Sequence, residues 1–396
     1  MHILLIHQAF ASINEAGGTR HYEFAKQLVQ NGHQVTVIAS PVSYLTGKDQ
    51  QKGDEWLEGI HIKRSYTYQA LHRSFIHRVF SFISFMVSSF LLGYKVKDVD
   101  IVWGTSPPIF QGVTALVLAR LKGAKFLFEV RDLWPDFAIA VGVLKSPLLI
   151  RLSLWLEKFL YRHADQMIVN SPAYIQHVKS RGCDQVDLVP NGADPDMFVG
   201  TNDGNDFRRE HGLEGAFVVM YAGAHGISND LQIVLHAAKL CEVNPQIKFV
   251  FVGDGKEKQN LVDLSNQLVN ANVMFIPSVP KASMGGVLAA ADACIAILKP
   301  IEEYKTTYPN KVFDYMAAGK PVVLAIDGVI REVVESAGCG IFAQPGDSVA
   351  LASVVQLIAS DPQKARQMGY AGRIYLQQHF SRSVLAQKFL SILTNM

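Results

Sequence analysis

Short runs of Val, Ile, Leu and Phe alternate along this chain with stretches of helical periodicity, and glycine-containing turns separate them. A strand that is apolar on both faces belongs in a parallel sheet that helices cover on both sides. The alternation therefore predicts an α/β fold. In the first half of the chain the predicted strands are residues 3–6, 34–39, 60–64, 101–104, 125–130 and 166–170.

The same alternation starts again after Pro190-Asn191-Gly192. The polar, turn-rich segment at residues 193–215 predicts a linker and a short helix. A length of 396 residues fits two domains of about 100–200 residues each. The strands predicted in the second half are residues 217–222, 247–252, 273–276, 293–298 and 321–325.

We therefore predict two Rossmann-like, doubly wound domains that face a cleft. The first spans residues 1–192 and is completed by a C-terminal helix at 377–396, and the second spans residues 193–376. In sheets of this kind, ligands bind outside the carboxyl ends of the strands.

The composition excludes several classes of protein. Hydrophobic residues make up 49% of the chain and charged residues 18%, which supports two buried cores and argues against disorder. A formal net charge of +2 is too balanced for a general nucleic-acid binder, so no nucleic-acid partner is expected. The four cysteines contain no Cys-x-x-Cys pair, which favours reduced thiols. The first residues predict a buried strand rather than a signal peptide, and we expect a cytoplasmic location.

Three glycine-rich turns follow predicted strands: Gly17-Gly18, residues 221–226, and Gly253-Asp254-Gly255. Glycine lets the backbone approach a phosphate closely, and a helix N-terminus offers free N–H donors. Each turn alone is equally compatible with a structural joint. The chain contains neither a Walker A sequence nor a complete G-x-G-x-x-G, which argues against an ATPase or an ordinary dehydrogenase.

The segment at residues 309–323 is the most informative. Pro309 is predicted to start a helix with Lys311 in its first turn and Asp314 one turn later on the same face. A basic side chain beside free N–H groups suits a diphosphate, and a carboxylate can accept hydrogen bonds from two ribose hydroxyls. An ordinary amphipathic helix with solvated charges is equally compatible. Our candidate donor-binding residues are Gly17, Gly18, Gly223, His225, Gly255, Lys258, Pro277, Asn310, Lys311 and Asp314.

Over nearly its whole length the chain resembles the retaining glycosyltransferases of family four, which have the GT-B architecture. The motifs that carry this resemblance, in order, are Gly17-Gly18, Pro190-Asn191-Gly192-Ala193-Asp194, Tyr221-Ala222-Gly223, Val252-Gly253-Asp254-Gly255, residues 313–323 and Gln344-Pro345-Gly346-Asp347. The resemblance implies a nucleotide diphosphate sugar donor, with UDP as the expected nucleotide. It also implies retention at the anomeric carbon, with no metal and no cofactor besides the donor.

Two further segments, residues 17–23 and 129–135, resemble bacterial enzymes of O-antigen and capsule synthesis, including N-acetyl-fucosamine transferases. That resemblance implies a lipid-diphosphate-linked sugar acceptor. The family often has two acids eight residues apart, and Asp314 matches the second, which holds the ribose. Thr306 stands where the first acid contacts the donor sugar, so an N-acetylated or 6-deoxy hexose is expected. The family's frequent Arg/Lys pair is also missing, which makes Lys311 our candidate for the diphosphate and Lys258 the second choice.

Candidate catalytic residues follow a predicted strand of the first domain. Asp132 is a candidate base for the acceptor hydroxyl, with Arg131 to orient it or a phosphate; a structural Arg–Asp pair is nearly as compatible. Glu15 is a competing base. Asp98-Val99-Asp100 and Asp194-Pro195-Asp196 look like a metal-binding Asp-x-Asp motif, but we expect no metal at either.

Residues 74–94 form a long apolar, aromatic-rich stretch with basic flanks. It is too short for the ~20 apolar residues of a spanning helix. We predict that it docks on the anionic inner leaflet and makes the protein peripheral on the cytoplasmic face of the inner membrane. The alternative is a helix buried against the sheet. The residues predicted to make the contact are Arg73, Phe75, Arg78, Phe82 and Phe85.

Three functions stay open from the sequence. The main one is a transferase that moves a sugar from a UDP-sugar to a lipid-linked glycan. A nucleotide-sugar epimerase of the same architecture needs no acceptor. A non-catalytic relative that binds nucleotide is the third, suggested by the acid missing at Thr306.

Overall fold

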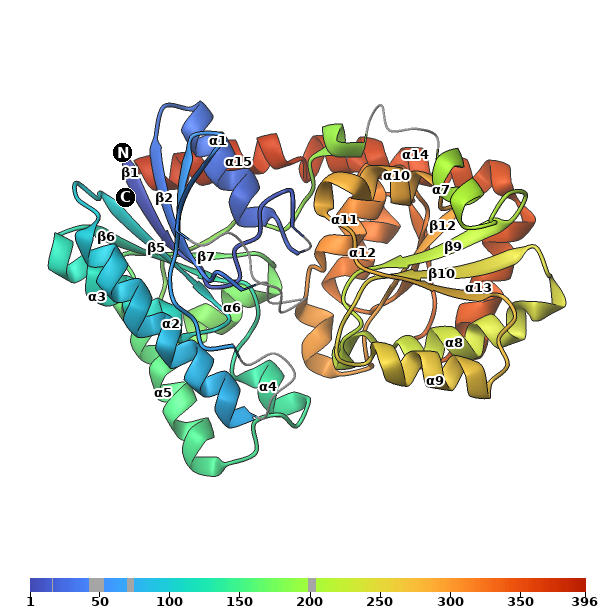
Figure 1. The fold of residues 1–396 in the computed structure, drawn as a ribbon, viewed down its shortest axis with the longest axis horizontal. Helices are drawn as coiled ribbons and strands as arrows, with labels where there is room; N and C mark the ends of the chain where they lie inside the picture. Colours follow the sequence, from blue (N-terminus) through green and yellow to red (C-terminus); the bar gives the residue numbers. More distant parts are fainter. Residues whose placement is uncertain (16, 43–52, 70–74, 199–203) are drawn as a thin grey trace. The chain divides into compact units, whose positions relative to one another are not determined.

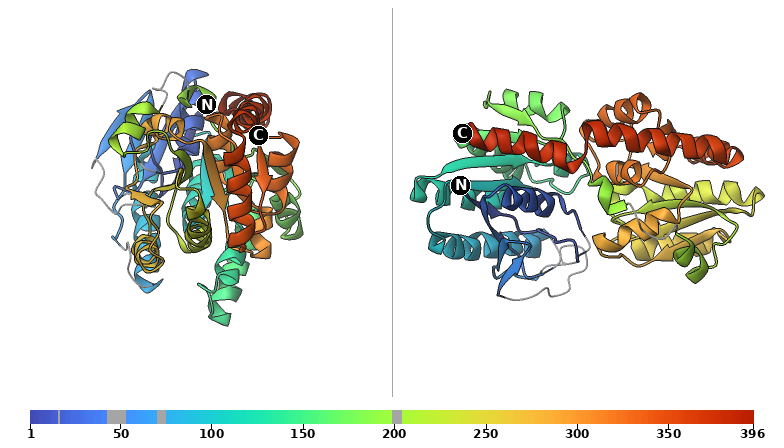
Figure 2. Two further views of the ribbon diagram at one scale, coloured as in Figure 1. Left: turned by 90° about the vertical axis from the view of Figure 1, so that its right-hand side faces the viewer. Right: turned by 90° about the horizontal axis from the view of Figure 1, so that it is seen from above.

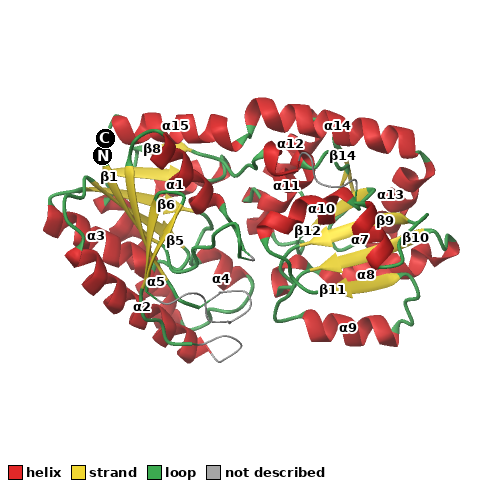
Figure 3. Cartoon of the chain, turned by 45° about the horizontal axis from the view of Figure 1, so that its top comes forward, coloured by secondary structure: helices red, strands yellow, loops and turns green. Residues whose placement is uncertain are grey.

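The computed structural model describes residues 1–15, 17–42, 53–69, 75–198 and 204–396, and the chain divides into two compact units (Figure 1). Each unit contains a sheet between two layers of helices, as the alternating sequence predicts (Figures 2 and 3). The first unit comprises Met1–Ser12, Gly17–Pro190 and Leu385–Met396; the second comprises Ile13–Ala16 and Asn191–Val384.

The first unit contains an eight-stranded sheet in the order β3-β4-β2-β1-β5-β6-β7-β8. Every neighbouring pair is parallel except the β3–β4 pair at one edge. The order reverses between β1 and β5, and ligands bind beyond the carboxyl ends of the strands at such a switch point. The strands are β1 (His2–Ile6), β2 (Gln34–Ala39), β3 (Asp54–Leu57), β4 (Ile60–Arg64), β5 (Ile101–Ser106), β6 (Lys125–Val130), β7 (Gln166–Val169) and β8 (Val186–Leu188).

Two helix layers cover this sheet (Figure 1). On one face α1 (Arg20–Gln30) lies beside α15 (Arg382–Thr394), and the rings of Phe24 and Phe389 are 5.2 Å apart. The other face has its own apolar core, which includes Phe85 and residues of the covering helices. Those helices are α2 (Phe75–Lys95), α3 (Phe110–Lys122), α5 (Pro147–His163) and α6 (Ala173–Ser180), and the short α4 (Asp136–Ala140) follows β6.

The second unit contains a six-stranded parallel sheet in the order β11-β10-β9-β12-β13-β14, which reverses between β9 and β12. Separate apolar cores fill its two faces. The strands are β9 (Phe217–Ala222), β10 (Ile247–Val252), β11 (Val273–Ile276), β12 (Ala293–Ile297), β13 (Val322–Ala325) and β14 (Gly340–Phe342). The helices are α7 (Asn205–Glu210), α8 (Leu231–Leu240), α9 (Lys258–Gln267), α10 (Met284–Ala289), α11 (Asn310–Ala317), α12 (Val329–Ser336), α13 (Ser348–Ser360) and α14 (Pro362–His379).

The structure corrects part of the prediction for residues 74–94. The side chain of Phe85 is 1% exposed and belongs to the core, and Phe82 is partly buried with its ring 6.0 Å from that of Phe110. These two residues lie on the inner side of α2, so they do not form its outer surface. Arg78 is exposed. Arg73 and the side chain of Phe75 lie outside the described residues.

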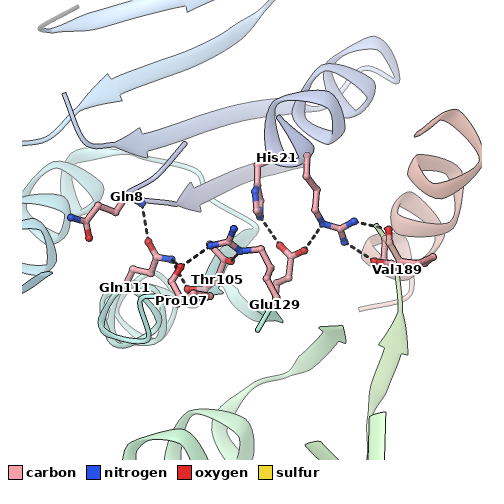
Figure 4. Close-up of polar contacts among 10 residues, drawn as sticks. Gln8, His21, Thr105, Pro107, Gln111, Glu129 and Val189 are labelled. Atoms are coloured by element: carbon pink, nitrogen blue, oxygen red, sulfur yellow. Dashed lines mark hydrogen bonds and ion pairs between the residues drawn. The ribbon is translucent and has the colours of Figure 1, made fainter. Parts of the chain in front are cut away.

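A buried ion network joins α1 to β6 in the first unit (Figure 4). The carboxylate of Glu129, which is fully buried, accepts hydrogen bonds from Arg20 Nε at 2.8 Å and His21 Nε2 at 2.7 Å. Arg20 also donates to the carbonyls of Val189 and Pro190 at 2.6 and 2.7 Å. Burial alone would raise the pKa of Glu129, but Arg20 and the His21 N–H outweigh it and hold that pKa well below its usual range. Burial lowers the pKa of His21 to about 4, so this ring is a neutral donor at pH 7.

Replacing the central carboxylate should therefore destabilise the first unit. We expect Glu129→Gln to lower its free energy of unfolding by about 3–5 kcal/mol, because the Arg20 guanidinium would stay buried without its counter-charge. All four tryptophans of the chain (residues 56, 103, 134 and 155) lie in the first unit, so tryptophan fluorescence during denaturation reports this unit selectively.

The matched control is Asp54→Asn in the same unit, whose side chain is 56% exposed and forms an ion pair with Lys63 at 2.5 Å. This change should cost less than about 1 kcal/mol. Equal costs for the two variants would show that the network does not stabilise the fold.

Candidate functional site

Two glycine loops at the carboxyl ends of β9 and β10 pack backbone against backbone. A β-carbon at Gly253 would lie 1.9 Å from the carbonyl oxygen of Gly223, and one at Gly255 would lie 2.5 Å from that of His225. Hydrogen bonds from Gly223 N to Val252 O and from His225 N to Asp254 O, each 2.9 Å, fix the two loops together. Any side chain at residue 253 or 255 would separate the loops, so glycine is required at both positions.

Lys311 in the first turn of α11 reaches the first of these loops. Its Nζ donates to Tyr221 Oη at 2.8 Å and to Asn229 Oδ1 at 2.9 Å, and it lies 4.3 Å from the centre of the Tyr221 ring. Its Cε and Nζ are within 3.7 Å of the β-carbon position of Gly223. Burial lowers the pKa of Lys311 to about 7. No carboxylate of the described residues forms an ion pair with it.

Asp314 lies one turn further along α11. Its partly buried carboxylate forms an ion pair with Lys281 Nζ, which lies 2.6 Å away. Asn310, the first residue of α11, is exposed, and so is Pro277 directly after β11. The segments that directly follow β9, β10 and β11, together with α11, thus carry eight of the ten residues predicted for the donor site, whereas Gly17 and Gly18 lie in the first unit.

Two of the predicted residues support the loops instead of offering free groups. Lys258 Nζ forms an ion pair with Asp254 at 2.7 Å and donates to the carbonyl of Gly253 at 2.8 Å. His225 is fully buried, and burial together with the charge of Lys258 lowers its pKa to about 4. Neither ring nitrogen of His225 has a hydrogen-bond partner among the described residues. Its neutral ring packs edge-on against the stacked rings of Phe251 and Phe275, with ring centres 6.3 and 6.2 Å away.

This arrangement combines the groups that a nucleoside diphosphate requires. Lys311 lies beside a glycine loop that brings backbone close to any ligand, and its ammonium has only neutral partners. Tyr221 and Asn229 are neutral, so a bound anion would provide the negative charge that pairs with the Lys311 ammonium. Asp314, with acceptor oxygens one turn away, suits hydroxyl groups.

The first unit contributes the predicted catalytic residues at the end of β6. Arg131 donates from Nε to Thr105 Oγ1 at 2.7 Å and from Nη2 to the Pro107 carbonyl at 2.6 Å, so its guanidinium is used to fix the loop after β5 (Figure 4). Asp132 lies at an exposed position. Desolvation of its carboxylate by the surrounding protein raises its pKa to about 6, and the positive charge of Arg131 opposes this rise.

The remaining candidates lie in the loop after β1. Gly17 has a φ of 155° and its β-carbon position is 3.0 Å from Ala11 Cβ, whereas Gly18 is exposed with no atom within 4 Å of that position. Both belong to the first unit. Glu15 is grouped with the second unit, where its carbonyl accepts a hydrogen bond from Lys281 N at 3.3 Å.

In each of the two Asp-x-Asp segments, one carboxylate accepts a hydrogen bond from a backbone N–H group. Asp100 accepts from His2 N at 2.7 Å, and Asp194 accepts from Asp196 N at 3.0 Å. Among the described residues, no group of three His, Cys, Asp or Glu side chains is placed to hold a metal ion.

Sequence reasoning did not select Tyr221, Asn229 or Lys281, which are the partners of Lys311 and Asp314. Tyr221 reads as one more apolar strand residue, and Lys281 lies 33 positions before Asp314 in the sequence. Asn229 lies three residues after the glycine-rich turn at 221–226, a position that indicates a helix cap rather than a ligand.

Comparison with known sequences assigns both units. Residues 16–192 match the family described as "Glycosyl transferase 4-like domain", and residues 203–375 match "Glycosyl transferases group 1". The chain is 26% identical over 301 residues to WbjE of Pseudomonas aeruginosa, named as a probable glycosyltransferase, covering 74% of each chain. It is 24% identical over 320 residues to WcaI of Escherichia coli K12, named as a putative colanic acid biosynthesis glycosyl transferase, covering 77% of this chain and 78% of WcaI.

Among solved structures, HepE of Anabaena, crystallised in complex with UDP and glucose, superposes with a TM-score of 0.76 at 18% identity. The match covers 100% of this chain and 99% of HepE. At this identity the comparison shows a shared fold, the two-domain GT-B architecture.

The backbone contact between the glycine loops generates a stability prediction. We expect Gly253→Ala to lower the stability of the second unit by about 3 kcal/mol or more, since the residue has a φ of 155° and its methyl would overlap the Gly223 carbonyl. Hydrogen exchange should accelerate in peptides that cover residues 217–225 and 247–258.

Gly286→Ala in α10 is the control, because its β-carbon position has no atom within 4 Å. That change should leave exchange unchanged or slow it, since alanine favours a helix over glycine by about 0.5–1 kcal/mol. Similar exchange in the two variants would mean that the loops do not depend on their close approach.

Proposed function

Because this chain belongs to the group 1 glycosyltransferases, we propose that it moves a hexose from a UDP-sugar to a lipid-linked glycan, with retention at the anomeric carbon. The name of WcaI, which refers to colanic acid biosynthesis, supports a role in bacterial surface polysaccharide synthesis, and we propose O-antigen or capsule as the product. The UDP in the HepE complex supports the nucleotide. The acceptor is proposed to be a lipid-diphosphate-linked sugar at the cytoplasmic face of the inner membrane.

One observation carries this proposal: the partly buried Lys311 has neutral hydrogen-bond partners and lies against the glycine loop at Gly223. An ammonium in such surroundings is stabilised by a bound anion. The start of α11 adds free backbone N–H groups, which carry partial positive charge like the ammonium.

The chemistry follows from charge. Breaking the bond between the anomeric carbon and the diphosphate oxygen leaves extra negative charge on the departing UDP. Lys311 and the α11 N-terminus stabilise that charge, and they do so more strongly in the transition state than in the ground state. Asp132 is the proposed base for the acceptor hydroxyl. We propose that this reaction needs no metal ion.

The donor sugar is proposed to be N-acetylated or 6-deoxy. Thr306 replaces the family's first acid, and its Oγ1 donates to the carbonyl of Glu303 at 2.5 Å. A short side chain that bonds to its own backbone leaves room for a larger or less polar sugar substituent. N-acetyl-fucosamine combines both features.

Calorimetry with UDP, GDP and ADP in EDTA tests the donor site. We expect micromolar binding of UDP alone. Asp314→Ala should weaken UDP binding by about 10- to 100-fold, because hydrogen bonds to a charged acceptor contribute about 1.5–3 kcal/mol. The control Asp263→Ala, on α9, should bind UDP like the wild type.

Each other outcome has a definite meaning. Unchanged affinity in Asp314→Ala would remove that residue from the site, and absence of any nucleotide binding would contradict a transferase function. UDP binding without sugar transfer to any acceptor, together with conversion of the free donor to its epimer, would favour the epimerase.

The pKa of Lys311 predicts how donor affinity depends on pH. Below about pH 7 its amine is charged before and after the donor binds, so affinity should be constant. Above pH 7 the free protein must take up a proton to bind, so the dissociation constant of a UDP-sugar should rise by up to tenfold per pH unit. A UDP-sugar is used because its diphosphate does not titrate in this range, whereas UDP itself does.

Lys311→Met should bind the UDP-sugar more weakly at pH 6 and lose the pH dependence. Lys256→Met, which removes an exposed lysine two residues before α9, should retain it. An unchanged slope in Lys311→Met would assign the proton uptake to another group.

Asp132→Asn tests the proposed base. Turnover should fall by about 10²- to 10⁴-fold while UDP affinity stays unchanged. In the wild type, kcat/KM should rise with pH through about 6 as the carboxylate forms. The exposed Asp184→Asn is the control, and full activity of Asp132→Asn would exclude Asp132 as the base.

A further inference from the structure

The outer side of α2 carries a continuous apolar stripe. Phe80, Ile83, Val87, Leu91 and Tyr94 recur every three or four residues and are 39–62% exposed. A spacing of three and four places side chains along one face of a helix. This stripe is opposite the face that buries Phe85, so core packing does not account for it.

The neighbouring helices extend the apolar surface. On α5, Leu148, Leu152 and Trp155 are 65%, 53% and 62% exposed. On α3, Val117 and Leu121 are 41% and 58% exposed. α3 contacts both α2 and α5, and all three helices pack on the same side of the first sheet (Figure 1). We call this outer surface of α2, α3 and α5 the three-helix face.

The charge of the three-helix face is of one sign. The three helices contain one acidic residue, Glu157, which is buried and bonded to His177 at 2.7 Å. On α5 the exposed basic side chains occupy the same face as Trp155, at positions one turn before and after the apolar ones. The exposed basic residues of the face are Arg78, Lys95, Arg151, Lys158 and Arg162. Arg120 is exposed too, but it forms an ion pair with Asp165 at 3.5 Å.

We propose that an anionic phospholipid bilayer covers the three-helix face, with Trp155 and the α2 stripe in the interfacial layer and the basic side chains at the phosphates. A large contiguous apolar surface is rare on monomeric proteins unless it contacts a partner. Tryptophan and tyrosine favour the membrane interface, and basic residues are attracted to an anionic surface. Within the described part of the chain, no helix has both the length and the apolar character to cross a bilayer.

Charge selects the bilayer over a second copy of the chain. A two-fold dimer through this face would place the same surface on both sides. Besides Arg120, which pairs with Asp165, five exposed basic residues would then face five others with no exposed acid on these helices to pair with them. An anionic bilayer supplies the opposite sign together with an apolar layer.

The inference deepens the proposed function, since it identifies the surface that would bring the site to a lipid-linked acceptor, but its test does not depend on activity. The probe is vesicle flotation with phosphatidylcholine alone and with 30% phosphatidylglycerol. The full chain should bind the anionic vesicles at least tenfold more than the neutral ones. Leu152→Glu/Trp155→Glu should reduce this binding at least tenfold.

A spectroscopic readout locates the contact. In a Trp56→Phe background, Trp155 is the remaining strongly exposed tryptophan among the described residues. Phosphatidylcholine brominated in its acyl chains, mixed with phosphatidylglycerol, should quench its fluorescence, and the further change Trp155→Phe should remove most of that quenching.

The matched control is Val243→Glu/Val269→Glu, which places two acids at exposed apolar positions of the second unit. This variant should bind vesicles like the wild type. Both double variants alter exposed side chains only, and an unchanged circular dichroism spectrum and melting temperature confirm that each is folded.

Three results would overturn the inference: vesicle binding that survives in the folded Leu152→Glu/Trp155→Glu variant, equal binding to neutral and anionic vesicles, or a concentration-dependent dimer that this variant abolishes. Failure of vesicle binding with normal UDP binding and transfer to a detergent-solubilised acceptor would reject the three-helix face and leave the proposed function intact. Vesicle binding without nucleotide binding would support the three-helix face and reject the proposed function.

Discussion

The close approach of two backbone loops determines the geometry of the second unit's site. Gly253 lies against the carbonyl of Gly223 at a distance that leaves no space for a β-carbon. This contact places the end of β10 directly beside the end of β9, and Lys311 lies against the β9 loop from the other side. The positions of the ammonium and the flanking loops therefore depend on an absence of side chains, which is a steric requirement rather than an attractive force.

Buried charge is treated in opposite ways in the two units. In the first, Glu129 is paired with Arg20 and a neutral His21, and the pairing keeps the carboxylate ionised inside the core. In the second, Lys311 has neutral partners, and its pKa falls to about 7. A buried charge that is already paired contributes to the stability of the fold and has little left to offer a ligand. A buried charge with only neutral partners can still form an ion pair with a ligand of opposite charge. This difference is the physical reason to assign a structural role to Glu129 and a binding role to Lys311.

The three-helix face shows how far a local sequence pattern can be interpreted. The apolar stretch at residues 74–94 indicated either a buried helix or a surface helix, and α2 is both: Phe85 packs in the core while Phe80 and Leu91 point outward. Because nearly all its faces are apolar, periodicity alone could not separate them. The sequence did not show that α5 belongs to this apolar surface either. Trp155 is exposed because the opposite side of α5 packs against the sheet, and that orientation is a property of the folded unit.

Apolar runs and glycine turns are local signals, and they were sufficient to predict the α/β architecture, most of its strands and the position of the helix that carries Lys311 and Asp314. It did not reveal the polar edge strand β3 or the three-residue strands β8 and β14, which lack an apolar run. The folded chain was needed to show that Lys311 contacts Tyr221 and Asn229, that His225 is buried, and that Glu129 neutralises Arg20. Those partners lie about 80 to 110 positions apart in the chain. Their contact depends on the strand order of the two sheets, and no local pattern of residues contains that information.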